Sequence, residues 1–371
     1  PWLDGAKLTA ITSLRQWKQT GGGDVDWTAA DILYAPTLKD STNPGSTKFR
    51  TFTQELRFAG STDRLNWLVG GFYTREDLGL HVRTVTYGSQ YEPYVSALLG
   101  GQLPLFTGRP ATGATFVQGQ DDLYNQSEEG FALFTNNSCK VTDALELTVG
   151  LRYTWENKDL HTFWSNTDGG IGCSTALARA AALGGPIPAT GSLIRAGGLL
   201  GSGPYQVLCA ASNSPAFGKI RNNDQHLKED KLTGTAKVAY RFSPEVMAYA
   251  SYARGYKAGG FNLDRIANTN QTVANTPTTP VLDTSFAPET VDSYEIGLKN
   301  TLLNRTLLLN VTGFYQDYSD FQLNAFNGLV FSVASVPKVV SKGVDADFLW
   351  FTPLDGLTVN GDTWWFNVRP S

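Results

Sequence analysis

The stretch that decides the fold is Leu145–Trp155, LELTVGLRYTW, which alternates apolar and polar residues without a break. Every odd position in it is apolar, whereas every even position is polar or small. Successive side chains of a strand point to opposite faces, so the pattern predicts a β-strand with one apolar and one polar face. A polar turn at Lys140–Ala144 and an extended run around Phe131 precede it. Together these segments predict a tight hairpin over Glu128–Lys158.

The length of this strand separates two classes of β protein. Ten steps from Leu145 to Trp155, at ~3.3 Å each, span roughly 33 Å. A strand tilt of ~40° reduces that length to a rise of about 25 Å, which is the height of the apolar band on an outer-membrane barrel. A strand in a soluble protein is usually only ~5–6 residues long. The length therefore predicts a membrane-spanning strand, since the alternation alone suits both classes.

The composition argues against two other kinds of protein. Charged residues make up 17% of the 371 residues, below the ~25% that is usual in soluble domains. A formal net charge of −4 argues against a nucleic-acid partner, which would require a basic patch. The sequence has no run of ~18 apolar residues, so it predicts no transmembrane helix. A barrel wall remains compatible with this composition, because it needs apolar residues at only every second position.

The pattern recurs along the chain and predicts about eleven strands. Short turns alternate strictly with long connections, which is the asymmetry of outer-membrane barrels, with short periplasmic turns and long extracellular loops. We therefore predict an all-β fold, an antiparallel transmembrane β-barrel. Two strands belong to the 128–158 hairpin, and the others are expected at 7–19, 48–60, 65–77, 227–242, 246–256, 289–301, 306–318, 341–352 and 357–367.

At Ser251–Asn262, SYARGYKAGGFN, the sequence resembles TonB-dependent outer-membrane receptors, especially the siderophore-receptor-like proteins. Further stretches resemble the same family in the same order along the chain, which makes the resemblance fairly specific. They are Thr53–Gly60 (TQELRFAG), Leu65–Glu76 (LNWLVGGFYTRE), Leu145–Trp155, Pro288–Lys299 (PETVDSYEIGLK) and Gly343–Phe348 (GVDADF).

The resemblance implies a 22-stranded barrel in the bacterial outer membrane, filled by the protein's own N-terminal plug domain. It also implies outer-membrane lipid, a TonB-type energy-coupling protein and a small-molecule ligand as partners. Residues 1–371 would then be a partial barrel domain, about half of the wall, without the plug and the C-terminal strands. We therefore expect the chain to be part of a longer protein. A barrel of this size is normally plugged, because its lumen would otherwise be an open channel.

Strand parity predicts which charged side chains face the lumen and the plug. If the apolar positions of Leu145–Trp155 face lipid, the intervening positions face inward. The alternative interpretation is that any large barrel has a polar interior, with no special role for a single residue. The predicted lumen-facing residues are Glu55, Arg57, Glu146, Arg152, Glu156, Glu295, Lys299, Asp345 and Asp347.

Ligand contacts are predicted where the strand ending at Tyr256 enters a loop. Lys257 could pair with an anionic iron chelate, while Tyr256 and Phe261 could stack on it, with Asn262 in the same segment. Gly259 and Gly260 permit backbone conformations that are closed to other residues. The alternative is that the segment is only a structural transition from strand to loop.

The cysteines and histidines give few further signals. Cys173 and Cys209 share one long glycine-rich connection, and we predict a disulfide between them, the alternative being two unrelated small residues. Cys139 would be left single. The three histidines lie far apart in the sequence, and no recognised catalytic motif is present. We expect no enzyme activity, no cofactor and no resident metal, so that any Fe³⁺ would belong to the transported ligand.

The leading functional hypothesis is a receptor that binds a scarce nutrient in its extracellular loops, and the ligand we expect is a ferric siderophore. It would import this ligand with TonB-coupled energy. A passive porin-like or secretion barrel is the second hypothesis. A soluble β-rich adhesin is the third, and its solubility without detergent would distinguish it from the first two.

Overall fold

The computed structural model describes most of the chain. The described residues are 5–24, 28–35, 45–83, 86–87, 89–98, 100–101, 119–166, 221–264, 283–326, 331–354 and 356–370, with the isolated positions 104, 175, 178 and 182. They form one large curved sheet, two small ribbons and the short helix α1 (Tyr91–Leu98). No helix among these residues is long and apolar enough to cross a membrane.

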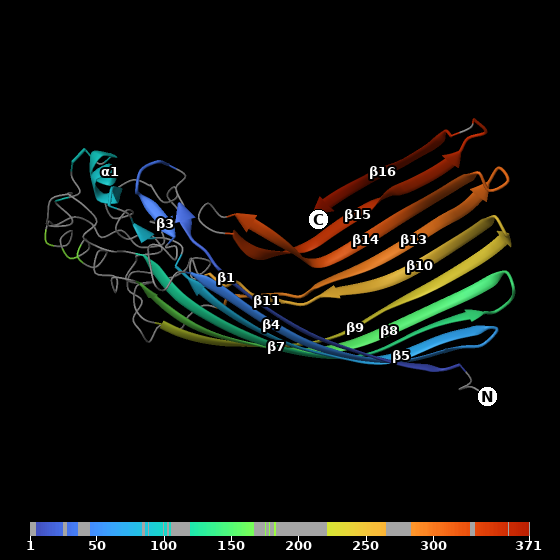
Figure 1. The fold of residues 1–371 in the computed structure, drawn as a ribbon, viewed down its shortest axis with the longest axis horizontal. Helices are drawn as coiled ribbons and strands as arrows, with labels where there is room; N and C mark the ends of the chain where they lie inside the picture. Colours follow the sequence, from blue (N-terminus) through green and yellow to red (C-terminus); the bar gives the residue numbers. More distant parts are fainter. Residues whose placement is uncertain are drawn as a thin grey trace.

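The large sheet has 11 strands, all antiparallel, that follow one another in chain order (Figure 1). This result confirms the predicted number and arrangement of strands. The two edge strands of this sheet are β1 and β16, and they do not pair with each other in the part of the chain described. The strands are β1 (Lys7–Thr20), β4 (Ser46–Ser61), β5 (Leu65–Val82), β7 (Gln120–Lys140), β8 (Leu145–Asn166), β9 (Arg221–Ser243), β10 (Val246–Lys257), β13 (Glu289–Leu302), β14 (Leu307–Phe326), β15 (Phe331–Phe351) and β16 (Thr358–Pro370).

Short turns lie at one end of the sheet and all the additional elements lie at the other (Figure 1). The turns comprise residues 62–64, 141–144, 244–245, 303–306 and, of the last turn, 352–354 and 356–357. The opposite end carries α1 and the three-stranded ribbon of β2 (Gly23–Asp24), β3 (Leu33–Ala35) and β6 (Thr86–Tyr87). We call these ends the turn end and the mouth end.

Several strands extend further toward the mouth end than the sequence predicted. The region 319–340, expected to be a loop, instead extends β14 and β15 as far as the pair Phe326–Phe331. The ladder skips Asp320 and Pro337, and Asp320 has the left-handed φ of 53°. This irregularity accommodates Pro337, which has no N–H to give to a ladder. The prediction failed because Asp320 and Pro337 interrupt the pattern, although an apolar–polar alternation resumes beyond them at Phe321–Ala325.

The connection 78–126 was also predicted to lack regular structure. The structure corrects this prediction, since β5 continues to Val82, β7 begins at Gln120 and helix α1 lies between them. Pro93 lies in the first turn of α1, where the missing N–H of proline costs no helical hydrogen bond. Its presence in the sequence therefore did not exclude a helix.

The two faces of the sheet differ in chemistry as the alternation predicted. The outer face carries exposed apolar side chains, for example Val149 at 48% and Leu151 at 49% exposure. Aromatic residues lie near the mouth-end limit of this band, where Phe131 and Trp155 stack with their ring centroids 5.6 Å apart. Such an arrangement of an apolar band with aromatic margins is typical of barrels that meet lipid. The opposite face, called the inner face here, is predominantly polar.

Candidate functional site

All nine residues predicted to face the lumen lie on the inner face of the sheet. Directly opposed residues of neighbouring strands share a face, so the register can be followed from one strand to the next. One such row is Glu55, Phe72, Ala132 and Thr154. A second row runs across the sheet from β15 to β8 through Asp345, Thr312, Gly297, Tyr249, Ala239 and Glu146. The nine residues have the parity of these rows, and their contact with a plug domain stays a prediction.

The sheet divides at the mouth end, between β9 and β10. The β9–β10 ladder ends at the pair Gly234–Arg254, although β9 extends further to Arg221 and β10 to Lys257. Beyond that point the chain leaves β10 and crosses the inner face. There β11 (Gly260–Phe261) pairs with β12 (Ser285–Phe286) in a two-stranded ribbon, which we call the mouth ribbon.

Charged side chains of β8 and β9 hold the start of the mouth ribbon. Tyr256 Oη shares its single proton between the carboxylates of Glu156, at 2.9 Å, and Glu229, at 2.6 Å. The Gly259 N–H donates to Glu229 at 3.0 Å, and Lys158 Nζ donates to the Gly259 carbonyl oxygen at 2.9 Å. Hydrogen bonds with one charged partner are stronger than neutral ones. These five residues, called the junction latch below, therefore fix the chain where it leaves the sheet.

The close approach in the junction latch explains one of the two glycines of the sequence motif. A Cβ atom at Gly259 would lie 2.6 Å from Glu229 Oε1 and 2.6 Å from the carbonyl oxygen of Phe286. Both distances are too short for a carbon atom, so a side chain at this position would force the ribbon away from β9. The glycine serves close packing here rather than an unusual backbone angle.

An apolar cluster and three side-chain amides hold the rest of the mouth ribbon. Phe261 is 7% exposed and packs with Tyr124, Leu160 and Trp164 of β7 and β8. Each amide binds the backbone or hydroxyl group of a segment beside the ribbon. They are Gln225 with Thr284 (2.8 and 2.9 Å), Asn262 with the Val333 backbone (2.7 and 3.2 Å) and Gln322 with the Ala258 carbonyl oxygen (2.9 Å).

The four residues predicted to contact ligand have different environments in this arrangement. Lys257 is exposed. Tyr256 is engaged by two carboxylates, Phe261 is buried, and Asn262 is bonded to Val333. The sequence reasoning missed Lys158, Glu229 and Gln225, which lie on the inner face above the apolar band. Their strand parity could have assigned them to the inner face from the sequence. Their contacts with the chain near Gly259, however, depend on the three-dimensional fold.

Two aromatic rings of the inner face, those of Phe134 and Tyr249, lie against glycines. Each ring also makes a cation–π contact with at least one basic side chain. A Cβ at Gly70 would lie 2.4 Å from the ring of Phe134, and the Arg152 guanidinium carbon lies 5.8 Å from the centre of that ring. Similarly, a Cβ at Gly297 would lie 2.5 Å from the ring of Tyr249. Nζ of Lys237 lies 4.9 Å and Nζ of Lys299 5.7 Å from the Tyr249 ring centre. In each case glycine makes the room that lets the ring lie along the sheet.

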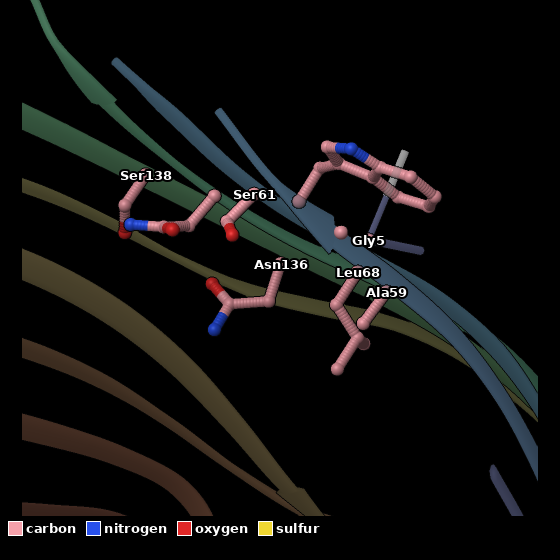
Figure 2. A pocket seen from close by; sticks show the side chains of 9 residues that line it. Gly5, Ala59, Ser61, Leu68, Asn136 and Ser138 are labelled. Atoms are coloured by element: carbon pink, nitrogen blue, oxygen red, sulfur yellow. The ribbon is translucent and has the colours of Figure 1, made fainter. Parts of the chain in front are cut away.

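A hollow of about 420 Å³ lies at the turn end, on β4, β5 and β7 (Figure 2). The lining residues that the structure describes are Gly5, Ala59, Gly60, Ser61, Asn66, Trp67, Leu68, Asn136 and Ser138. None of these side chains carries a formal charge, so this hollow offers hydrogen bonds and apolar contacts but no charged anchor.

The predicted disulfide between Cys173 and Cys209 lies outside the described residues and stays a prediction. Cys139 is free and exposed. Each histidine has an aspartate neighbour, at 2.6 Å for His81–Asp121, 2.9 Å for His161–Asp224 and 2.6 Å for His226–Asp159. Within the described part of the chain, no group of three or more His, Cys, Asp or Glu side chains is arranged to hold a metal ion.

The family comparison decides what kind of barrel this sheet belongs to. Residues 4–370 match the family model described as TonB dependent receptor-like, beta-barrel. The chain belongs to the TonB-dependent receptor family. Members of this family are receptors of the Gram-negative outer membrane, and the apolar outer face of the sheet is typical of the surface that such barrels turn to lipid. The family is thus one of receptors and not one of enzymes.

Solved structures agree with this receptor fold. The ferric yersiniabactin uptake receptor FyuA from Yersinia pestis aligns with a TM-score of 0.59 at 13% identity, over 99% of this chain and 41% of its own. The siderophore receptor PiuA from Acinetobacter baumannii aligns with a TM-score of 0.53 at 14% identity, over 99% and 45% respectively. The iron transporter FrpB from Neisseria meningitidis gives 0.51 at 12% identity, over 98% and 40%. The receptor chain therefore spans less than half the length of these proteins, and identities this low support the fold alone.

Proposed function

We propose that the chain forms part of the wall and the mouth of a receptor. This receptor would bind a scarce nutrient outside the cell and import it with TonB-coupled energy. The proposed ligand is a ferric siderophore. The observation that carries this proposal is the fixed mouth ribbon, since strands β8, β9, β14 and β15 all hold it. Because the mouth ribbon is fixed, a loop that continues from it can hold its binding surface in one position relative to the ligand. Structural neighbours named for siderophores and iron support the choice of ligand.

Lys257 is the residue of this segment that we propose to contact the ligand. It lies between Tyr256 and Gly259 of the junction latch and is exposed, so its ammonium group can pair with an anionic chelate. We propose that Tyr256, Phe261 and Asn262 act by holding the segment in place, because their polar or aromatic groups already have partners.

The inner face is proposed to hold the receptor's own plug domain. The nine residues from Glu55 to Asp347 would then meet the plug or line the path that opens beside it. A polar inner face suits contact with a soluble domain, because polar groups on both sides can satisfy each other's hydrogen bonds. The coupling protein would act on the plug and not on this wall.

The proposal can be tested by growth of a receptor-deletion strain on single ferric siderophores as iron sources. We expect the complete receptor gene to restore growth on a subset of them, and only in cells that have TonB. Restoration without TonB would indicate the porin-like alternative, and restoration on none would contradict a role in iron uptake. Lys257→Glu should raise the ligand concentration needed for half-maximal uptake. Lys228→Glu, on the exposed outer face of β9, is the matched control and should not.

A further inference from the structure

Several cations of the described chain are stabilised in one of two ways. In the first, a carboxylate neutralises the charge, as in Lys158–Glu128 at 3.2 Å and Lys338–Asp317 at 3.0 Å. In the second, an aromatic ring holds the cation, as for Arg152, Lys237 and Lys299. We call these three the ring-held cations. None of them forms an ion pair with another described residue.

A ring holds a cation without removing its charge. The negative face of the ring attracts the cation electrostatically and fixes its position. Two ammonium groups approach the same Tyr249 ring, although like charges repel each other. Arg152 donates from Nε to Thr154 Oγ1 at 3.1 Å, and no described residue accepts from its terminal nitrogens. The wall thus presents positioned, unneutralised positive charge to whatever occupies the lumen, and a guanidinium is well suited to bind a carboxylate with two hydrogen bonds.

The distribution of the three charges indicates the size of their partner. Arg152 lies opposite Thr233 on β9, and Lys237 lies four residues further along β9 toward the turn end, which corresponds to roughly 13 Å. Lys299 lies opposite Met247 on β10, still nearer the turn end, and belongs to β13, two strands away from β9. Two strand spacings add roughly 10 Å across the sheet. One small chelate cannot contact all three positions, whereas a polypeptide segment can.

We propose that the ring-held cations dock an acidic polypeptide segment that fills the lumen of this receptor. The carboxylates of that segment pair with Arg152, Lys237 and Lys299 along a diagonal from the middle of the wall toward the turn end. This inference rests on the proposed function, because it requires a lumen-filling segment of the same protein. It adds where that segment binds, with what charge, and through which three residues.

Zero-length cross-linking tests this docking in outer membranes that contain the complete receptor. A water-soluble carbodiimide joins amines only to carboxylates that touch them, and peptide mapping by mass spectrometry identifies the pairs. We expect Lys237 and Lys299 to link to Asp or Glu residues outside positions 1–371. The Arg152→Lys variant keeps the charge and should add a third link of the same kind. The Lys158–Glu128 pair is the internal positive control, and Lys228 on the outer face is the negative control.

The outcomes separate this inference from the proposed function. If Lys231, a neighbouring inner-face residue, or Lys158 links to a segment outside 1–371 while Lys237 and Lys299 do not, the lumen is filled but the docking site is wrong. If no inner-face lysine links to such a segment while Lys158–Glu128 links normally, the lumen-filling segment itself is contradicted. Charge reversal by Lys237→Glu with Lys299→Glu should abolish their links, and it should leave the Lys158–Glu128 link unchanged.

Discussion

The membrane half and the mouth half of the same strands use opposite ways to place charge. In the membrane half the outer face is apolar, and Arg152 rests on rings of the inner face. In the mouth half both faces carry charge, and Lys158 is bound to Glu128 and to the Gly259 carbonyl oxygen. In the mouth half, the paired charge of Lys158 lies where the chain folds onto the sheet. In the membrane half, Arg57 is paired with Glu55, whereas Arg152 is held by rings and keeps its charge toward the lumen.

The largest expected effect comes from placing a charge on the outer face of the membrane half. Leu151→Arg should destabilise the folded receptor by about 2–4 kcal/mol, because an arginine near the bilayer midplane loses its hydration. The amount of heat-modifiable, folded receptor in the outer membrane measures this loss. Asn125→Arg is the matched control, because Asn125 lies on the exposed outer face of the mouth half. Equal losses for both variants would show that the two halves do not differ in their surroundings.

A second change tests whether the mouth half folds onto itself as tightly as described. Gly259→Ala should destabilise the mouth ribbon by about 1–3 kcal/mol, because the added carbon overlaps with Glu229 and Phe286. If ligand binding must restore the ribbon's native position, apparent affinity for the ferric siderophore should fall about tenfold for each 1.4 kcal/mol of binding free energy spent on it. Gly71→Ala is the control, since the nearest atom to its added carbon is 3.8 Å away. Unchanged affinity for Gly259→Ala would show that the ribbon does not position the binding surface.

A smaller effect is expected when only the hydrogen bonds of the junction latch are removed. Tyr256→Phe keeps the ring but loses both bonds to Glu156 and Glu229, which should cost about 1.5–3 kcal/mol at a charged, half-buried site. Amide hydrogen exchange at Gly259 reports the loss directly, because that N–H donates to Glu229. Tyr252→Phe removes one bond to Asp292 on the outer face and should leave that exchange rate as it is. Slow exchange in Tyr256→Phe would indicate that the apolar cluster alone fixes the ribbon.

The smallest effect is expected on the outer face of the mouth half. His161 and Asp224 form a pair whose side chains are 65% and 71% exposed, and exposed pairs contribute only about 0–1 kcal/mol. His161→Ala should therefore leave the thermal unfolding midpoint nearly unchanged. A drop comparable to that of Tyr256→Phe would show that this face is covered by another part of the receptor.

The sequence predicted the wall much better than the mouth. Alternation along a strand requires only that each residue lie on one of two faces, so parity assigned Arg152 and Asp345 to the same face that the strand register gives them. The contact between Gly259 and Glu229 joins positions 30 residues apart, and no periodicity reports it. Strand ends were missed for a related reason, since the mouth-end part of β8 carries charged residues on its outer face and buried apolar residues on its inner face, which reverses the alternation of the membrane half while the ladder continues.

The early end of the β9–β10 ladder has a consequence for how the receptor would open. From Gly234 toward the mouth end, every second peptide group of β9 points to a side where the described residues provide no neighbouring strand. On its other side, β9 still pairs with β8 as far as Arg221. We call the open side of β9 the seam, and unfolding that starts there breaks side-chain contacts of the junction latch before it breaks any ladder bond between β9 and β10. The seam is therefore the place where the mouth can loosen first, while the membrane-spanning ladder below it stays closed.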